Sequence, residues 1–172
     1  LTGWLAWFRS AHPAEAEPIA DEQQRDPSAV LARLDGVAWG LGNAAQGRTL
    51  HQQRGCFGCH EGGRFGPELS GITIRLNRVD LFTHIVNPNL AIAPAYRTVQ
   101  ITARDGTTHV GVPIYDSPEA TLLEIAPGTT VRLTGDDIRR VEPVQRSLMP
   151  EGLLNGFSRS DLADLYSHLR TL

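Results

Sequence analysis

The chain of 172 residues contains only two cysteines, and both lie in the pentapeptide Cys56-Phe57-Gly58-Cys59-His60. No disulfide framework is therefore available, and any covalent staple has to come from a cofactor. Two thiols separated by two residues can reach both vinyl groups on one edge of a porphyrin, and the histidine that follows places its imidazole beneath the iron. The motif predicts one covalent haem c, attached to Cys56 and Cys59, with His60 as the proximal iron ligand.

Two other uses of a Cys-x-x-Cys pair fit the sequence less well. A structural zinc site needs four ligands, usually with a second Cys or His pair at fixed spacing, and the chain has no second Cys pair. A thioredoxin-like redox pair follows a strand in a βαβ unit, and that pattern is missing before Cys56. Haem attachment is therefore the favoured interpretation.

The residues downstream of the motif supply the other parts of a haem site. A carbonyl of the Gly66-Pro67 turn can accept the Nδ1–H of His60 and fix its tautomer, which makes Pro67 a candidate site residue. Met149 is the only methionine and lies in a loop before the last helix, from which a thioether can reach the iron opposite His60. The alternative for Met149 is a gap-filling role in the core.

Charged and aromatic residues near the motif are further candidates. Arg75 and Arg78 follow the Gly-Pro turn, and a guanidinium matches the carboxylate of a haem propionate. The alternative for both arginines is a solvated turn. We expect Phe57, Phe65 and Phe82 to line the pocket and to lower its local dielectric.

The other five histidines have less specialised interpretations. His84 and His168 lie off the apolar faces of their helices, so both are predicted to face solvent. His51 lies on the helix that leads into the haem motif and is predicted to be a packing residue. His84 is the reserve candidate for the sixth iron ligand. His12 and His109 fall in a linker and in a predicted strand.

Helical spacing of apolar residues predicts four helices, one starting at Pro27, one at 43–54, one at 77–87 and one running from Ser158 to the chain end. Asp26 supplies a capping carboxylate before Pro27, and Ser158 with Asp161 resembles a capping box. Gly55 can end the second helix in a left-handed conformation and lead directly into the haem motif.

Between residues 94 and 146 the apolar period changes from 3.6 to two. Asp105-Gly106 is a hairpin signal, and Ser117-Pro118 and Pro127-Gly128 mark further turns. The segment predicts a small antiparallel sheet or partly closed barrel, inserted into a mainly helical fold that is α+β overall. The expected organisation is a lead-in with a short helix (1–42), a haem domain (43–93 and 147–172) and the inserted β module (94–146).

The start of the chain and its charge restrict the remaining possibilities. The aromatic cluster at residues 1–8 is too short to span a bilayer, and residues 11–24 resemble a linker. Because Met149 is the only methionine, we expect a fragment or processed product whose leader lies upstream. The net charge of −3, with scattered arginines, makes nucleic acid an unsuitable partner.

The order of motifs GRTLHQQRGCFGCH, GPELSGI, HIVNPNLAIAPAYRTV and SLMPEGLL resembles a class I cytochrome c. More narrowly, residues 45–172 are similar to the planctomycete and verrucomicrobial type of haem-binding domain. The resemblance implies a cytochrome c fold interrupted by a small β module, usually at the C-terminal end of a larger exported protein, often behind a propeller-type, sugar-dehydrogenase-like region. It implies Cys56, Cys59, His60 and Met149 as the residues that hold haem. The chain departs from the pattern at His51, where such helices commonly carry an aromatic residue that packs near Tyr166.

The expected function is electron transfer with both axial positions of the iron filled, so that the domain by itself is not an enzyme. The expected partners are a dehydrogenase domain or other cytochromes, in the periplasm or on an exported protein, because haem c is attached outside the cytoplasm. One alternative is a haem enzyme, or a gas or redox sensor, with an open sixth position or with bis-His ligation through His84. Another is that the β insertion is itself a recognition module.

Overall fold

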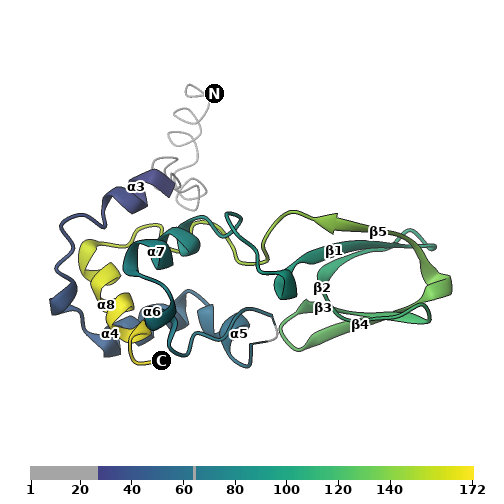
Figure 1. Cartoon of the computed structure of the whole chain (residues 1–172), viewed down its shortest axis with the longest axis horizontal. Coiled ribbons are helices and arrows are strands. Elements are labelled where there is room, and N and C mark those ends of the chain that lie inside the picture. Colours follow the sequence, from purple (N-terminus) through teal and green to yellow (C-terminus); the bar gives the residue numbers. More distant parts are fainter. Residues whose placement is uncertain (1–26, 64) are drawn as a thin grey trace, which may run out of the picture.

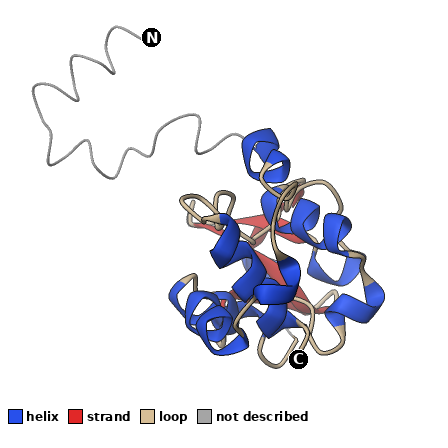
Figure 2. Ribbon diagram, turned by 90° about the vertical axis from the view of Figure 1, so that its left-hand side faces the viewer, coloured by secondary structure: helices blue, strands red, loops and turns tan. Residues whose placement is uncertain are grey.

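The computed structural model describes residues 27–63 and 65–172, and its fold is α+β. Helices gather at one end of the molecule and a sheet forms the other end (Figure 1). Seen from the helical end, the helices lie in front of the strands (Figure 2). The expected aromatic cluster, the linker and the Asp26 cap lie outside the described residues.

The four predicted helices are all present, and two short helices join them. The α-helices are α3 (Pro27–Ala32), α4 (Ala44–Gln53), α5 (Cys56–His60), α6 (Ile72–Arg75), α7 (Arg78–Val86) and α8 (Arg159–Leu169). Short 3-10 turns are η2 (Trp39–Leu41), η3 (Pro94–Tyr96) and η4 (Gly135–Asp137). In the part of the chain that is described, no helix is long and apolar enough to cross a membrane.

Local side-chain chemistry sets the helix ends, as the sequence predicted. The Asn43 side chain accepts hydrogen bonds from the first turn of α4, and Gly55 follows that helix with a φ of 71°. Ser158 and Asp161 form a complete capping box at the start of α8. Asn77 caps α7 in the same way. These ends are decided within a few residues, which is why the sequence reveals them.

Helices α4 and α8 cross at very short distance. A Cβ added at Gly47 would lie 1.9 Å from the carbonyl oxygen of Asp164, so only a glycine permits this approach. The crossing buries His168, which is 5% exposed and packs its ring against His51 with the centroids 5.1 Å apart. The prediction that His168 faces solvent is wrong, because the close crossing widens the buried face of α8.

The helical core includes residues from before α4 as well as from α6, α7 and α8. Val30 and Val37, from the segment expected as a lead-in, pack in the same core as Leu162. Phe82 is fully buried there and packs against the rings of Trp39 and Tyr166, which also contact each other. Residues 27–42 thus complete this core.

The inserted segment folds into five antiparallel strands. These are β1 (Thr98–Ala103), β2 (Thr108–Asp116), β3 (Ala120–Ala126), β4 (Thr129–Thr134) and β5 (Ile138–Val144). Their order is β4-β3-β2-β1-β5, which confirms the predicted small antiparallel sheet. Strands β4 and β5 are its two edges, so among the described residues the sheet is open and does not close into a barrel.

The sheet has its own core and a narrow connection to the helices. Ile101, Leu123 and Leu133 are central to this second core. Thr98 at the start of β1 pairs with Val144 at the end of β5, so the chain enters and leaves the sheet on neighbouring strands. This is the geometry of an insertion whose ends lie side by side (Figure 1).

Candidate functional site

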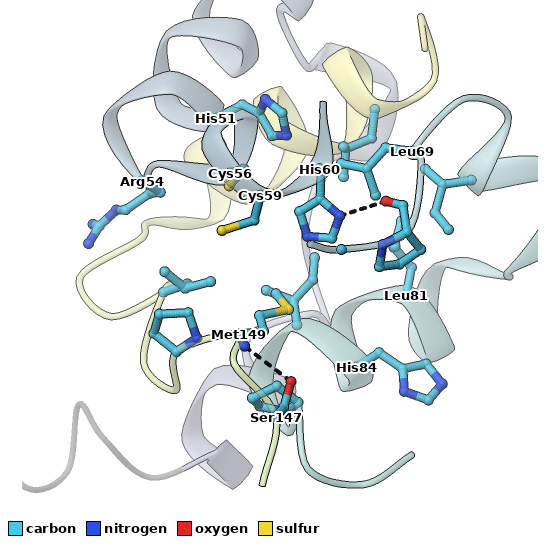
Figure 3. A pocket seen from close by; sticks show the side chains of 18 of the residues that line it. His51, Arg54, Cys56, Cys59, His60, Leu69, Leu81, His84, Ser147 and Met149 are labelled. Carbon is cyan, nitrogen blue, oxygen red and sulfur yellow. Dashed lines mark hydrogen bonds between the residues drawn. The ribbon is translucent and has the colours of Figure 1, made fainter. Parts of the chain in front are cut away.

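A cavity of about 570 Å³ opens within the helical part of the molecule (Figure 3). Its walls come from α4 and the Cys56–His60 motif, from the helices α6, α7 and α8, and from the loop at 147–154. Apolar side chains dominate the lining, among them Leu69, Ile72, Leu81 and Leu165. Cofactor sites in proteins are apolar cavities of about 300–1,000 Å³ with a few convergent polar groups, and this cavity matches that description.

The Cys56–His60 motif forms one wall of the cavity. The left-handed Gly55 ends α4 and lets the single-turn helix α5 begin at Cys56. Cys56 and Cys59 are three residues apart on this helix, so their thiols share one face, and both residues line the cavity together with His60. The sequence-predicted attachment residues are therefore brought together.

Both cysteines are free thiols and half-buried. Burial raises the pKa of Cys56, and the neighbouring Cys59 adds to this effect. Burial also raises the pKa of Cys59. The reactive cysteine of a thioredoxin-like pair has a lowered pKa, so these thiols are unsuited to that role. In the two described ranges, no group of three or more His, Cys, Asp or Glu residues could hold a metal ion.

The imidazole of His60 is fixed by the loop that follows it. Its Nδ1 lies 2.7 Å from the carbonyl oxygen of Pro67, which confirms the predicted hydrogen bond. Because a carbonyl can only accept, Nδ1 carries the proton, and Nε2 keeps its lone pair for a metal. A Cβ at Gly66 would lie 3.1 Å from the same Nδ1, so glycine allows the loop to approach closely. Arg75 secures the loop by donating to the carbonyls of Glu68 and Ser70, at 2.7 and 3.1 Å.

Met149 lines the same cavity from the loop before α8. Its side chain extends into the cavity, with the sulfur on the side that faces His60 (Figure 3). The backbone N–H of Met149 donates to the Oγ of Ser147, at 3.1 Å. The cavity therefore has an imidazole on one wall and a thioether on another.

His84 also lines the cavity and is half-buried, which corrects the prediction that it faces solvent. The cavity reaches the His84 side of α7, and this could not be inferred from the apolar face of that helix. In Figure 3 the His84 ring points away from both His60 and Met149.

The arginine that lines the cavity is not one of the two that the sequence predicted. Neither Arg75 nor Arg78 lines the cavity. The Arg78 guanidinium lies over the rings of Trp39 and Tyr166, 4.5 and 4.8 Å from their centroids. Arg54 lines the cavity instead, and sequence reasoning missed it although it directly precedes the Gly-Cys junction.

The aromatic lining also differs from expectation. Phe65 lines the cavity, as predicted. Phe57 instead meets the His51 ring edge-on, with the centroids 5.0 Å apart, and Phe82 is part of the helical core. Tyr96 lines the cavity without having been predicted, and its hydroxyl donates to the Gly63 carbonyl at 2.9 Å.

His51 is buried where α4, α5 and α8 meet, which confirms its predicted packing role. Burial, together with charge repulsion from His168 and His60, lowers the pKa of His51 to about 4. Neither ring nitrogen of His51 has a hydrogen-bond partner among the described residues. The imidazole is therefore held in its neutral form near pH 7.

Comparison of the sequence with models of known protein families and with curated proteins gives no match. The interpretation of the site therefore rests on its residues and their geometry.

Proposed function

We propose that this chain is an electron-transfer domain that carries one covalent haem c with His60 and Met149 as axial ligands. One observation carries the proposal: a single apolar cavity is lined by Cys56, Cys59 and His60 on one wall and by Met149 on another. The four residues come from segments almost ninety positions apart, yet they converge on one cavity.

The residues present fit such a group. Cys56 and Cys59 would hold it through two thioether bonds, and their free thiols lie on one face of α5. The Pro67 carbonyl orients His60 so that Nε2 is the free nitrogen. Among the described residues, Arg54 is the one arginine of the cavity lining, and it would counter the charge of a propionate.

When bound, the group supplies one-electron chemistry by alternating between ferric and ferrous iron. The chain contributes a fixed coordination sphere and an apolar surrounding. A thioether opposite an imidazole favours the ferrous state more than a second imidazole does, which raises the reduction potential. With Met149 in place, the site has no position for a substrate, so its residues favour a carrier over a catalyst.

The arrangement of the helices and the sheet supports a proposal about the fold, the redox partner and the location of the domain. The helix before the haem motif, α4, crosses the terminal helix α8 through Gly47, and we propose that the helical part is a cytochrome c fold with the sheet as an insertion. The domain would then exchange electrons with a dehydrogenase domain or another cytochrome. Covalent attachment of haem c takes place outside the cytoplasm, so the proposed location is the periplasm or an exported protein, with this chain at its C-terminal end.

Optical spectroscopy of the haem-loaded chain tests the axial ligands. We expect the ferric protein to show the weak far-red sulfur-to-iron band, and we expect Met149→Ala to lose it. His84→Ala is the matched control, since it also alters the cavity wall, and it should keep the band. If Met149→Ala and the unaltered chain have the same spectrum, the proposed ligation is wrong.

A second candidate function follows from His84, which lines the same cavity. If His84 or an open position replaced Met149, the domain would be a sensor or haem enzyme. Carbon monoxide distinguishes the carrier from an open site, because a six-coordinate iron binds it poorly and an open site binds it readily. Ligation by His84 would instead be recognised by the absence of the far-red band in the unaltered chain. For the carrier, we expect the ferrous spectrum to change little when carbon monoxide is added.

A further inference from the structure

Side chains from other elements hold the loop that bears Met149: Thr98 and Arg54 donate to backbone carbonyls before and after the methionine. Residues 145–158 connect β5 to α8 and contain no regular helix or strand. The Met149 N–H donates to a neighbour within the loop, the Ser147 hydroxyl two residues earlier. The position of the thioether therefore depends on what fixes the two sides of the loop.

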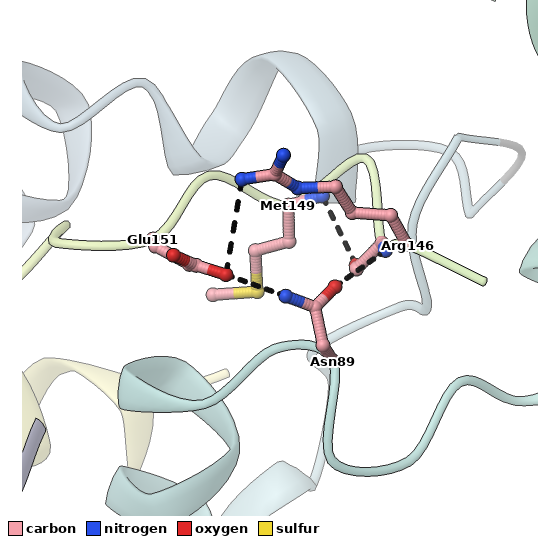
Figure 4. A network of polar contacts seen from close by, with 5 residues as sticks. Asn89, Arg146, Met149 and Glu151 are labelled. Atoms are coloured by element: carbon pink, nitrogen blue, oxygen red, sulfur yellow. Dashed lines mark hydrogen bonds and ion pairs between the residues drawn. The ribbon is translucent and has the colours of Figure 1, made fainter. Parts of the chain in front are cut away.

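Asn89, in the turn after α7, contacts both sides. Its Oδ1 accepts the backbone N–H of Ser147 at 2.7 Å, and its Nδ2 donates to Oε1 of Glu151 at 2.5 Å (Figure 4). Ser147 and Glu151 each lie two positions from Met149, one before it and one after it. One planar amide thus bridges the loop around the thioether.

The bridge needs the particular chemistry of an amide. Asn89 has to accept from a backbone N–H and donate to a carboxylate at the same time, which an aspartate or an alanine cannot do. Arg146 also approaches Oε1 of Glu151, but at 4.0 Å and with both side chains largely exposed. Such an exposed pair contributes little, so from outside the loop Asn89 supplies the side-chain contacts nearest to Met149 on both sides.

We propose that Asn89 is a positioning residue that keeps the Met149 thioether at the iron and slows its replacement by other ligands. The inference rests on the proposed function, because it assumes that Met149 is an axial ligand. The chain contains no lysine, so a lysine of this chain cannot take its place. His84 of α7 lines the cavity and is an internal nitrogen donor that could replace the thioether.

The test measures how fast added imidazole displaces the sixth ligand of the ferric, haem-loaded chain. Loss of the far-red band monitors this displacement. Removal of two hydrogen bonds by Asn89→Ala should speed displacement by roughly tenfold or more. Asn87→Ala is the matched control, since this nearby amide makes no hydrogen bond to the loop, and its displacement rate should stay within about twofold of the unaltered chain. Equal rates for Asn89→Ala and Asn87→Ala would overturn the proposal.

A pair of variants separates positioning from a general loss of structure. Asn89→Asp keeps the acceptor for Ser147 but faces Glu151 with a second carboxylate, so it should also speed displacement. Adding Glu151→Gln supplies a donor to that aspartate and should restore slow displacement. If the double variant is as fast as Asn89→Asp alone, the bridge does not position Met149.

Hydrogen exchange of the haem-free chain gives a readout that does not depend on ligation. Asn89→Ala should speed exchange of the Ser147 amide relative to Asn87→Ala, and an unchanged rate would contradict the bridge. The failure of the proposed function is recognised separately, because the unaltered haem-loaded chain would then lack the far-red band. If the unaltered chain shows the band but Asn89→Ala leaves the displacement rate unchanged, only the role of Asn89 is disproved.

Discussion

At the scale of single residues, His51 shows how the site is built into the helix crossing. Its ring is 4% exposed and contacts the rings of Phe57 in α5 and His168 in the terminal helix. Both of its nitrogens lack a hydrogen-bond partner among the described residues, which is a costly arrangement for a buried polar group. A buried imidazole of this kind links the stability of the fold to pH.

We predict that the chain loses stability as the pH falls from 7 to 5. Burial lowers the pKa of His51 to about 4, whereas the unfolded chain has the ordinary value of 6.5. Between these values the unfolded state binds the proton and the folded state does not, so the stability present above pH 6.5 is lost on acidification. His51 alone should contribute about 2 kcal/mol to the loss between pH 7 and pH 5.

Urea unfolding of the haem-loaded chain at the two pH values measures this effect. His51→Phe retains an aromatic ring and removes the titrating group, so its loss of stability should be smaller by about that amount. His109→Phe, on strand β2, controls for the loss of a histidine elsewhere. An equal pH dependence in His51→Phe and the unaltered chain would rule out this role of His51.

Residue roles were predictable where they depend on near neighbours in sequence. The hydrogen bond between His60 and Pro67 joins residues seven positions apart, and it was inferred correctly from the sequence. The burial of His168 and the cavity position of Arg54 were missed. Each depends on which segment of a distant helix or loop packs beside it, and the apolar pattern of one helix does not contain that information.

At the scale of elements, the crossing of α4 and α8 depends on glycine. A side chain at Gly47 would collide with the backbone of α8, and a backbone cannot move aside as a flexible side chain can. We predict that Gly47→Ala lowers the free energy of unfolding by about 1–3 kcal/mol, because the two helices must separate. Urea unfolding measures the change.

Gly40→Ala is the matched control for this prediction. A Cβ at Gly40 would meet no atom within 4 Å, and its φ is not in the left-handed region. Its effect should stay within about 0.5 kcal/mol. Equal effects of the two substitutions would mean that the close crossing does not matter for stability.

The helices and hairpins were predictable because caps and turns are local, but strand β5 was not predicted. It carries the polar run Arg139 and Arg140 and the proline Pro143, and it forms an edge of the sheet. Edge strands tolerate charged residues and proline, since one side of the strand is unpaired. Their sequences therefore lack the regular alternation that identifies an inner strand such as β1.

At the scale of the whole molecule, two separate cores lie side by side in one chain. Because Thr98 and Val144 are neighbours, we predict that replacing residues 99–143 with a two-glycine turn leaves the helical part folded. The shortened chain should keep its helical circular dichroism and its haem with the far-red band. Loss of haem retention would show that the sheet is needed for the site, and loss of reduction by a partner alone would assign the sheet to recognition.

The central claim is that Cys56 and Cys59 attach haem in this cavity. The most direct test is the mass of the denatured chain after expression in cells that attach haem c, beside a variant with both cysteines replaced by serine. We predict that the unaltered chain gains the mass of one haem, that the gain survives denaturation, and that the variant does not gain it. An unaltered chain that matures without added mass, or a serine variant that retains haem through denaturation, would contradict the claim.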